Sequence, residues 1–122
     1  MILEDLTERI ISCAIEVHKE LGPGLLESNY QAALAIDLGV AGLSFVREPI
    51  IPVIYRGTRI GQHRPDFIVE SAVVLEVKSV ERYDPVFAAQ VLTYLRITGA
   101  RIGLLLNFNR PVMKDGIKRF AL

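Results

Sequence analysis

The residues best suited to chemistry lie in the segment RPDFIVESAVVLEVKSV, residues 64–80. In a strand, residues two apart point to the same face, so Glu76 and Lys78 would lie side by side while Val77 points into the opposite layer. Asp66 belongs to the preceding predicted strand, and a short turn can bring its carboxylate next to Glu76. We therefore expect two acids and a lysine to converge.

Such a cluster favours metal-dependent hydrolysis. Neighbouring carboxylates repel each other unless a cation lies between them, and oxygen ligands suit Mg²⁺ or Mn²⁺. A lysine beside the metal can hold or deprotonate the attacking water, or stabilise charge on a phosphoryl oxygen. This is the chemistry of phosphodiester hydrolysis. The alternative is an ordinary cross-strand ion pair on a solvated face.

Two helices are predicted to precede the strands. Apolar residues recur at steps of three and four over residues 3–21, which is typical of an amphipathic helix, and Gly-Pro-Gly at 22–24 ends it. A second helical pattern begins near Leu25 and ends near Gly39 or Gly42, where glycine can adopt a left-handed cap.

Three strands joined by tight turns are predicted next. They cover Ile50–Tyr55, Arg59–Val69 and Val73–Val80, with turns at residues 56–58 and 70–72. The third strand consists almost entirely of residues with high β propensity, which predicts a central position in the sheet.

A helix and a last strand complete the predicted domain. Asp84-Pro85 can cap a helix that runs to about Thr98, and Gly99 ends it. The apolar strand Arg101–Phe108 follows, and a helical crossover favours parallel pairing with the previous strand. The predicted order is ααβββαβ in one three-layer α/β domain with a mixed sheet, residues 1–122.

This arrangement resembles the PD-(D/E)XK nuclease superfamily. Pro65-Asp66 preserves the literal PD, Glu76-Val77-Lys78 matches the (D/E)XK element, and the family's core order αβββαβ matches the predicted elements. An acid-x-lysine string alone is weak, but its place on the third of three strands before a helix strengthens it. The resemblance implies a restriction-endonuclease-like fold and a metal-dependent nuclease.

Two further strings point to particular branches. Gln90 and Tyr94 form a QxxxY spacing that resembles the RecB-like exonucleases, where these residues are associated with the active site and the nucleic-acid strand. The alternative is that Tyr94 packs in the core and Gln90 caps locally. GLLESNY at residues 24–30 resembles the GxxExxY proteins, which implies that Glu27 is a helix-borne acid of the site. Glu27 could equally be a simple N-terminal cap.

Other polar residues near these motifs have two interpretations each. His18 could bind an acid or a phosphate, or be a structural residue at a helix end, and we favour the structural role. Glu16 competes with Glu27 for the role of helix acid but lies outside the string. His63 and Arg64 could reach a phosphate beside the metal, or do nothing specific on an exposed strand.

The composition is that of a globular protein without a strongly basic surface. Of 122 residues, 51% are apolar and 23% charged, which is typical of a globular chain, and the net charge of zero argues against a strongly basic nucleic-acid coat. Acidic residues predominate in residues 1–42 and basic ones afterwards, so a local basic surface is compatible with the sequence. Cys13 has no partner at metal-ligand spacing and is predicted to be a buried structural thiol.

No membrane segment is predicted. No apolar run approaches the roughly 18 to 20 residues needed to span a bilayer, and the start of the chain is acidic rather than basic, so we expect a cytoplasmic protein. The high apolar content of a small chain favours self-association into a homo-oligomer.

The sequence thus predicts a Mg²⁺- or Mn²⁺-dependent nuclease that acts on nucleic acid, DNA in preference to RNA. The predicted metal ligands are Glu27, Asp66, Glu76 and the Val77 carbonyl. Glu27, Asp66, Glu76 and Lys78 are the predicted catalytic side chains. Arg64, Gln90 and Tyr94 are predicted to bind the substrate. The alternatives are a catalytically silent binding or regulatory module with the same fold, and an oligomer-forming accessory subunit.

Overall fold

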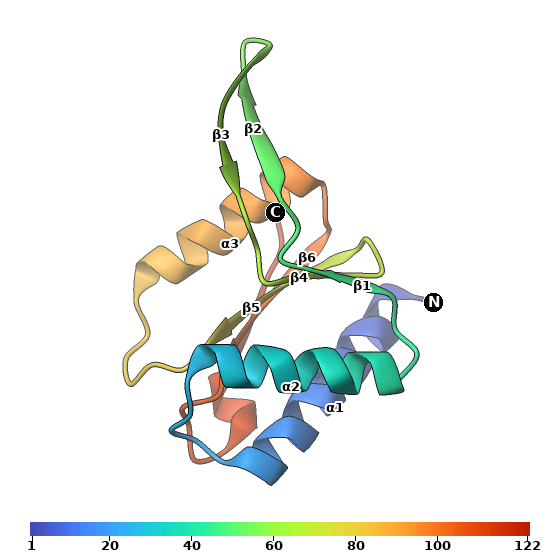
Figure 1. Cartoon of the computed structure of the whole chain (residues 1–122), viewed down its shortest axis with the longest axis vertical. Helices are drawn as coiled ribbons and strands as arrows, with labels where there is room; N and C mark the ends of the chain where they lie inside the picture. Colours follow the sequence, from blue (N-terminus) through green and yellow to red (C-terminus); the bar gives the residue numbers. More distant parts are fainter.

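The computed structural model describes all residues from Met1 to Leu122 and has three layers (Figure 1). The helices are α1 (Leu3–Leu21), α2 (Glu27–Val40) and α3 (Pro85–Thr98), with a short 3₁₀ helix η1 (Met113–Gly116). The strands are β1 (Phe45–Arg47), β2 (Ile51–Tyr55), β3 (Thr58–His63), β4 (Phe67–Val69), β5 (Val73–Lys78), β6 (Ile102–Asn107) and β7 (Ile117–Phe120).

Five strands form one mixed sheet in the order β1-β4-β5-β6-β7. The only parallel pair is β5 with β6, which α3 connects, and the other three pairs are antiparallel. The central strands β5 and β6 are almost completely buried, as a strand covered on both faces must be. Antiparallel edge strands flank this parallel centre, so the fold is of the restriction-endonuclease-like α/β class.

Helices α1 and α2 cover one face of the sheet. Their apolar stripes and the residues Val73, Leu75 and Val77 of β5 belong to one continuous hydrophobic core. Tyr30 is fully buried there, stacks on Phe108 with ring centroids 4.5 Å apart, and donates a hydrogen bond to the Gly22 carbonyl. Tyr30 therefore fixes the turn between α1 and α2 from inside the core.

Helix α3 covers the opposite face. Its N-cap residue Asp84 accepts a hydrogen bond from the Val86 N–H, and Gly99 ends it in the left-handed conformation, as predicted. Tyr94 and Leu95 pack on Val74 in a smaller hydrophobic cluster. Val91 lies directly over Gly103 of β6, where a Cβ would meet Val91 Cγ1 at 2.3 Å. The absence of a side chain at Gly103 sets how closely α3 approaches the sheet.

Strands β2 and β3 form a separate two-stranded sheet, which we call the β-ribbon (residues 51–63). It projects from the body of the molecule beside α3 (Figure 1). Arg56 and Gly57 at its tip have positive φ, the signature of the type I′ turn that suits the twist of a hairpin. The predicted turn at residues 56–58 is thus confirmed.

The predicted strand Arg59–Val69 was wrong as one element. It is divided between β3 in the β-ribbon and β4 in the main sheet, with residues 64–66 in neither. Pro65 lies in this break and cannot donate a ladder hydrogen bond, which is why one strand does not run through it. Strand β1, η1 and β7 were not predicted; β1 and β7 extend the sheet at its two edges.

The remaining predicted elements are confirmed to within two residues at their ends, and the fold class with them. The turn after β4 has positive φ at Glu70 and Ser71 and a hydrogen bond from Ala72 N–H to Val69 C=O. No helix combines the length and the apolar composition that crossing a membrane requires.

We predict that Gly103→Ala destabilises the protein by about 1–3 kcal/mol, the usual cost of overpacking, because the new methyl group would displace Val91 and with it α3. Urea denaturation followed by circular dichroism measures the change. Gly61→Ala is the matched control, because a Cβ at Gly61 meets no atom within 4 Å. An unchanged unfolding midpoint for Gly103→Ala would contradict this packing.

Candidate active site

Strand β5 separates apolar from charged side chains. Val73, Leu75 and Val77 point into the core under α1 and α2. Alternation then places Glu76 and Lys78 on the face that α3 covers, as the sequence predicted. Glu76 is only 4% exposed, so this carboxyl group is held inside the protein.

Asp66 lies immediately before β4 and opposite Glu76. The ladder pairs Phe67 with Leu75, and continuing it by one residue aligns Asp66 with Glu76. The Asp66 backbone N–H donates a hydrogen bond to Glu76 Oε1 at 2.9 Å, and Asp66 Oδ2 accepts one from the Val77 N–H at 2.7 Å. The predicted meeting of the two acids is therefore present, and backbone N–H groups hold both carboxylates.

A hydrogen-bonded chain from α2 holds the other oxygen of Asp66. Gln31 is buried and donates from Nε2 to Asp66 Oδ1 at 3.0 Å. Its own carbonyl oxygen accepts from Arg47 Nε at 2.7 Å, which fixes which way the amide points. Each oxygen of the Asp66 carboxylate thus has one donor and keeps lone pairs free on its remaining side.

The protein environment makes both acids hard to ionise. Burial, the largest cause, and the Asp66 charge raise the pKa of Glu76 to about 8, although the Asp66 N–H and Lys78 oppose the shift. Burial likewise raises the pKa of Asp66 above its usual range, while the Val77 N–H and Gln31 lower it. The two carboxylates together carry more negative charge than the nearby protein groups balance.

Lys78 contributes positive charge to this cluster from the same face of β5. Its charge lowers the pKa of both Asp66 and Glu76, but its Nζ lies within 4.0 Å of neither carboxylate. The ammonium instead lies 4.7 Å from the centroid of the Phe87 ring on α3. Lys78 is therefore near both acids but not bound to either.

Glu27 begins α2 at the rim of the cluster. Its Oε2 accepts a hydrogen bond from the Ser79 N–H at 3.3 Å, and its charge raises the pKa of both Asp66 and Glu76. Ser79 also donates from its hydroxyl to the Leu25 carbonyl at 2.6 Å, which ties the start of α2 to the end of β5. Nevertheless, no three His, Cys, Asp or Glu side chains are grouped so that they could hold a metal ion together.

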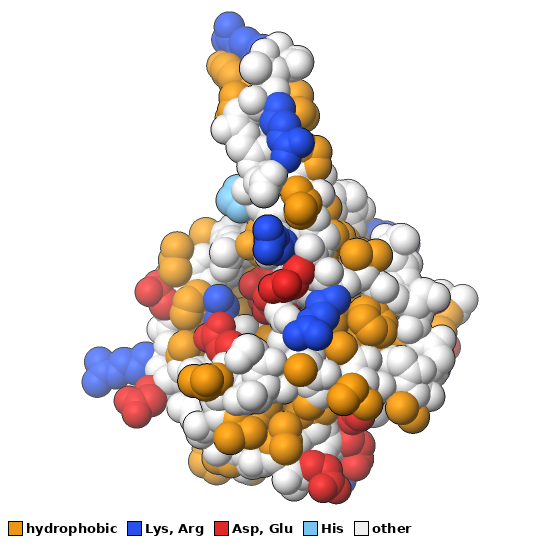
Figure 2. Space-filling model, viewed as in Figure 1, with side chains coloured by type: hydrophobic (Ala, Val, Ile, Leu, Met, Phe, Trp, Pro, Cys, Tyr) orange, Lys and Arg blue, Asp and Glu red, His pale blue; other side chains and the backbone are white.

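Residues on α3 complete the wall of the site. Tyr94 is buried, and its burial and the charges of Glu76 and Asp66 raise its pKa to about 12, while Gln90 lowers it. Gln90 lies one helical turn before Tyr94 on α3. Arg64 is exposed on the segment that leads to Asp66. Figure 2 shows acidic side chains gathered in the middle of the body, with basic ones around them.

The sequence analysis missed Gln31, Arg47 and Ser79. The signal for Gln31 was present, because it lies four residues after Glu27 and therefore one turn along the same helix face. Arg47 could not have been found, because it reaches the site only through β1, a strand that was not predicted.

Other candidate residues have structural roles. His18 is buried and its Nε2 lies 2.7 Å from the Arg110 carbonyl, so this nitrogen must carry the proton that it donates. Cys13 is buried as predicted, and burial raises the pKa of its thiol. Glu16 is exposed and pairs with Lys19 at 3.4 Å.

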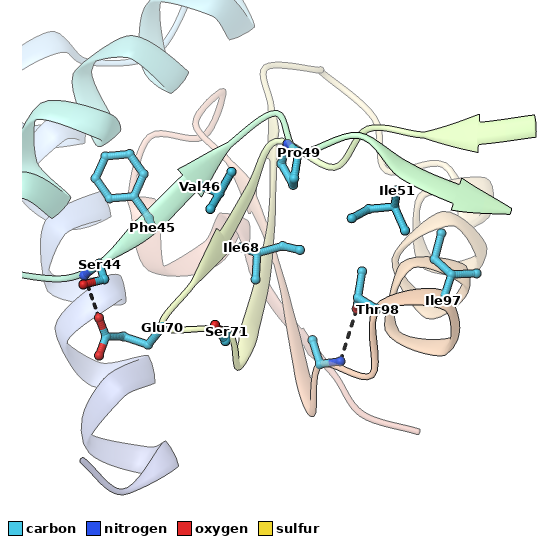
Figure 3. A pocket seen from close by; sticks show the side chains of 11 residues that line it. Ser44, Phe45, Val46, Pro49, Ile51, Ile68, Glu70, Ser71, Ile97 and Thr98 are labelled. Atoms are coloured by element: carbon cyan, nitrogen blue, oxygen red, sulfur yellow. Dashed lines mark hydrogen bonds between the residues drawn. The ribbon is translucent and has the colours of Figure 1, made fainter.

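A second hollow lies apart from the acids (Figure 3). Its volume is about 470 Å³, and β1, the start of β2 and the end of α3 form it with mainly apolar side chains such as Val46, Ile68 and Ile97. Its one carboxylate, Glu70, accepts a hydrogen bond from the Ser44 N–H at 2.6 Å. Glu70 is the only ionisable side chain that lines the hollow, so the grouped acids lie elsewhere, at Asp66 and Glu76.

The acid cluster fits a divalent cation by its donor chemistry. Asp66 and Glu76 offer hard carboxylate oxygens that are poorly neutralised. The Val77 N–H faces Asp66 beyond the end of β4, and in an extended strand the carbonyl of the same residue points to the same side. That carbonyl has no β4 partner there and is available as a further oxygen donor.

In the absence of metal, we predict that the free energy of unfolding falls as the pH rises from about 4.5 to about 8. The folded-state pKa of Glu76 is about 8, above its ordinary value of 4.5, so folding must keep a proton that the unfolded chain has lost across this range. Glu76→Gln removes the titrating group and should flatten the profile.

Urea denaturation in EDTA at several pH values measures this dependence. Glu81→Gln, which neutralises an exposed carboxylate, is the control and should retain the wild-type slope. Equal slopes in Glu76→Gln and the wild type would show that Glu76 is not buried as described.

Comparison with known proteins agrees with this geometry. A family model described as "PD-(D/E)XK nuclease superfamily" matches residues 4–120. Searches of curated proteins and of solved structures found no match. The family match spans nearly the whole chain, and Asp66, Glu76 and Lys78 lie within the matched range. The chain therefore belongs to the PD-(D/E)XK nuclease superfamily.

Proposed function

We propose that this chain is a Mg²⁺- or Mn²⁺-dependent nuclease that hydrolyses phosphodiester bonds of DNA. The observation that carries the proposal is the pair of Asp66, half-buried, and Glu76, buried, joined through a hydrogen bond, with Lys78 on the same face of β5 as Glu76. A scaffold has no need for two poorly neutralised carboxylates beside a lysine, because their burial costs stability.

In the proposed site, Asp66, Glu76 and the Val77 carbonyl hold the cation, and Glu27 is the third acid at the rim. The bound cation supplies Lewis-acid activation of a phosphoryl oxygen and of water. Gln31 and the Val77 N–H orient the Asp66 carboxylate, so its metal-binding geometry exists before the cation arrives.

Lys78 holds or deprotonates the attacking water, or stabilises the charge that develops on the phosphoryl oxygen. Its ammonium lies close enough to lower the pKa of both acids, yet it is bound to neither and can turn toward the substrate. The Phe87 ring holds the ammonium by a cation–π contact that a phosphate could replace.

Gln90, Tyr94 and Arg64 position the nucleic acid. The charges of Glu76 and Asp66 act on Tyr94, and Gln90 precedes it by one turn of α3, which supports the proposed relation to the RecB-like branch. The role of Glu27 in the GLLESNY string supports the relation to the GxxExxY proteins, since its charge acts on both acids. Tyr30 of that string stabilises the preceding turn.

We predict that Lys78→Ala lowers the rate of DNA cleavage by at least about 100-fold, the scale expected for loss of a group that stabilises transition-state charge. The fold should persist, as circular dichroism can check. Gel assays with single- and double-stranded DNA and RNA, with Mn²⁺ or with EDTA, measure the rate.

Lys19→Ala is the matched control for this variant, because Lys19 pairs only with exposed Glu16 on α1. Cleavage by Lys78→Ala at the wild-type rate would refute the catalytic assignment. Binding of DNA by the wild type without any cleavage would instead support a catalytically silent module.

We predict that Gln31→Ala weakens Mn²⁺ binding by about 10- to 100-fold, the usual effect of losing a side chain that orients a metal ligand. Asp66 Oδ1 would lose its donor while the Asp66 carboxylate itself stays. Isothermal titration calorimetry measures the affinity. Gln62→Ala removes the same side chain from the β-ribbon and should bind Mn²⁺ as the wild type does; equal affinity in both variants would exclude this role for Gln31.

A further inference from the structure

The β-ribbon carries basic but no acidic side chains and projects from the body (Figure 1). Residues 49–65 contain Arg56, Arg59, Arg64 and His63 but no Asp or Glu. The one ion pair of the protein is elsewhere, on α1, so none of these arginines is neutralised by a carboxylate. Figure 2 shows basic side chains at the tip of the β-ribbon and along its length.

The local geometry presents these charges outward. Arg56 occupies the first central position of the tip turn with φ of 49°, a conformation that non-glycine residues rarely adopt. A β-bulge between Val53 and Ile54 shifts the register, so that Arg59 comes within 2.5 Å of Gln62 Oε1 although the two are three residues apart. A bulge of this kind re-aims a side chain, and here it holds Arg59 on the face of Gln62.

The base of the β-ribbon lies beside the acid cluster. The His63 ring packs edge-on against Tyr94, with centroids 5.7 Å apart, and only Arg64 and Pro65 separate His63 from Asp66. The six residues of β3 extend about 20 Å at roughly 3.3 Å per residue. The β-ribbon therefore carries its arginines outward from a base next to the candidate metal ligands.

We propose that the β-ribbon inserts into the major groove of double-stranded DNA and thereby selects duplex DNA as the substrate. The proposal rests on the proposed nuclease function, because the β-ribbon would hold the duplex whose backbone the acid cluster cleaves. The acid cluster repels phosphates, so attraction must come from elsewhere, and the β-ribbon is the adjoining element with unpaired positive charge.

Size and chemistry favour this occupant. Two strands about 4.8 Å apart fit the roughly 12 Å width of the major groove of B-form DNA, whereas the major groove of duplex RNA is too narrow. The arginines would contact phosphates at the groove edges. The exposed apolar side chains of Ile54 and Ile60, 57% and 64% exposed, would meet thymine methyl groups.

The test measures binding of a fluorescein-labelled 24-base-pair DNA by fluorescence anisotropy at several NaCl concentrations, in EDTA so that metal-dependent cleavage does not interfere. The double variant Arg56→Gln/Arg59→Gln should weaken binding and reduce the slope of log K against log [NaCl] by about 1.8, which is roughly 0.9 for each lost phosphate contact. Single-stranded DNA and duplex RNA should show no comparable change.

Two controls show whether the change in DNA binding depends on the positive charge of Arg56 and Arg59 in the β-ribbon. Arg56→Lys/Arg59→Lys keeps the charge and should keep most of the slope. Arg101→Gln removes an exposed charge from the loop before β6 and should leave the slope unchanged. An unchanged slope in the glutamine variant, equal losses for all three nucleic acids, or no binding of duplex DNA by the wild type would overturn the proposal.

Hydrolysis of bis(p-nitrophenyl) phosphate with Mn²⁺ distinguishes this inference from the proposed function. The glutamine variant should hydrolyse this small diester at the wild-type rate, because the β-ribbon does not contact it. If the wild type cleaves neither this diester nor DNA while the slope still changes as expected, the nuclease function fails and DNA binding by the β-ribbon stands.

If the glutamine variant alters only self-association in analytical ultracentrifugation, the β-ribbon is a contact between copies of this chain and the proposal is wrong.

Discussion

The hydrogen bond from the Asp66 N–H to the Glu76 carboxylate is the contact on which the site depends. It forms because β4 begins only at Phe67, so the backbone at residue 66 is free to bind a side chain rather than a strand. The Asp66 carboxylate can then take the Val77 N–H, which a longer β4 would have occupied. Two negative groups are thereby placed together at the end of a short strand, where their charge is only partly offset.

The rest of the fold keeps this unfavourable arrangement in place. The core under α1 and α2 holds β5 by its apolar residues, so Glu76 cannot turn away from α3 without exposing that core. Gln31 holds Asp66 from α2, and Tyr94 closes the site from α3. A cation that offsets the two charges would therefore stabilise the folded state as well as serve catalysis, because it would bind the folded chain in preference to the unfolded one.

The hydrophobic period and the residue propensities were enough to predict the helices, the central strands and the common face of Glu76 and Lys78, because each depends on a short segment of sequence. They failed for the predicted strand Arg59–Val69. Its β-forming residues are continuous in sequence, but they belong to two sheets, and only tertiary packing decides where one ends. The short edge strand β1 has too few residues to show a period, so Arg47 and its link through Gln31 to Asp66 were not foreseeable.

The same limit applies to the proposed ligands. The sequence predicted Glu27 as a ligand together with Asp66 and Glu76. In the structure the three acids do not form one group that could hold a metal ion, because a hydrogen bond from the Ser79 N–H holds Glu27 at the rim. Side-chain hydrogen bonds of this kind depend on how a loop packs. The packing of a loop cannot be predicted from a local sequence pattern. The proximity of Asp66 and Glu76 was predictable because the strand register determines which backbone positions are neighbours. The positions of the two carboxylates follow from the positions of their backbones.

The central claim is that Asp66 and Glu76 bind one divalent cation together. X-ray diffraction from crystals grown with Mn²⁺, with anomalous differences recorded near the manganese absorption edge, tests it most directly. We expect a peak within coordination distance, on the order of 2 Å, of oxygens from both carboxylates. A crystal in which Mn²⁺ binds at other places while the space between Asp66 and Glu76 stays empty would contradict it.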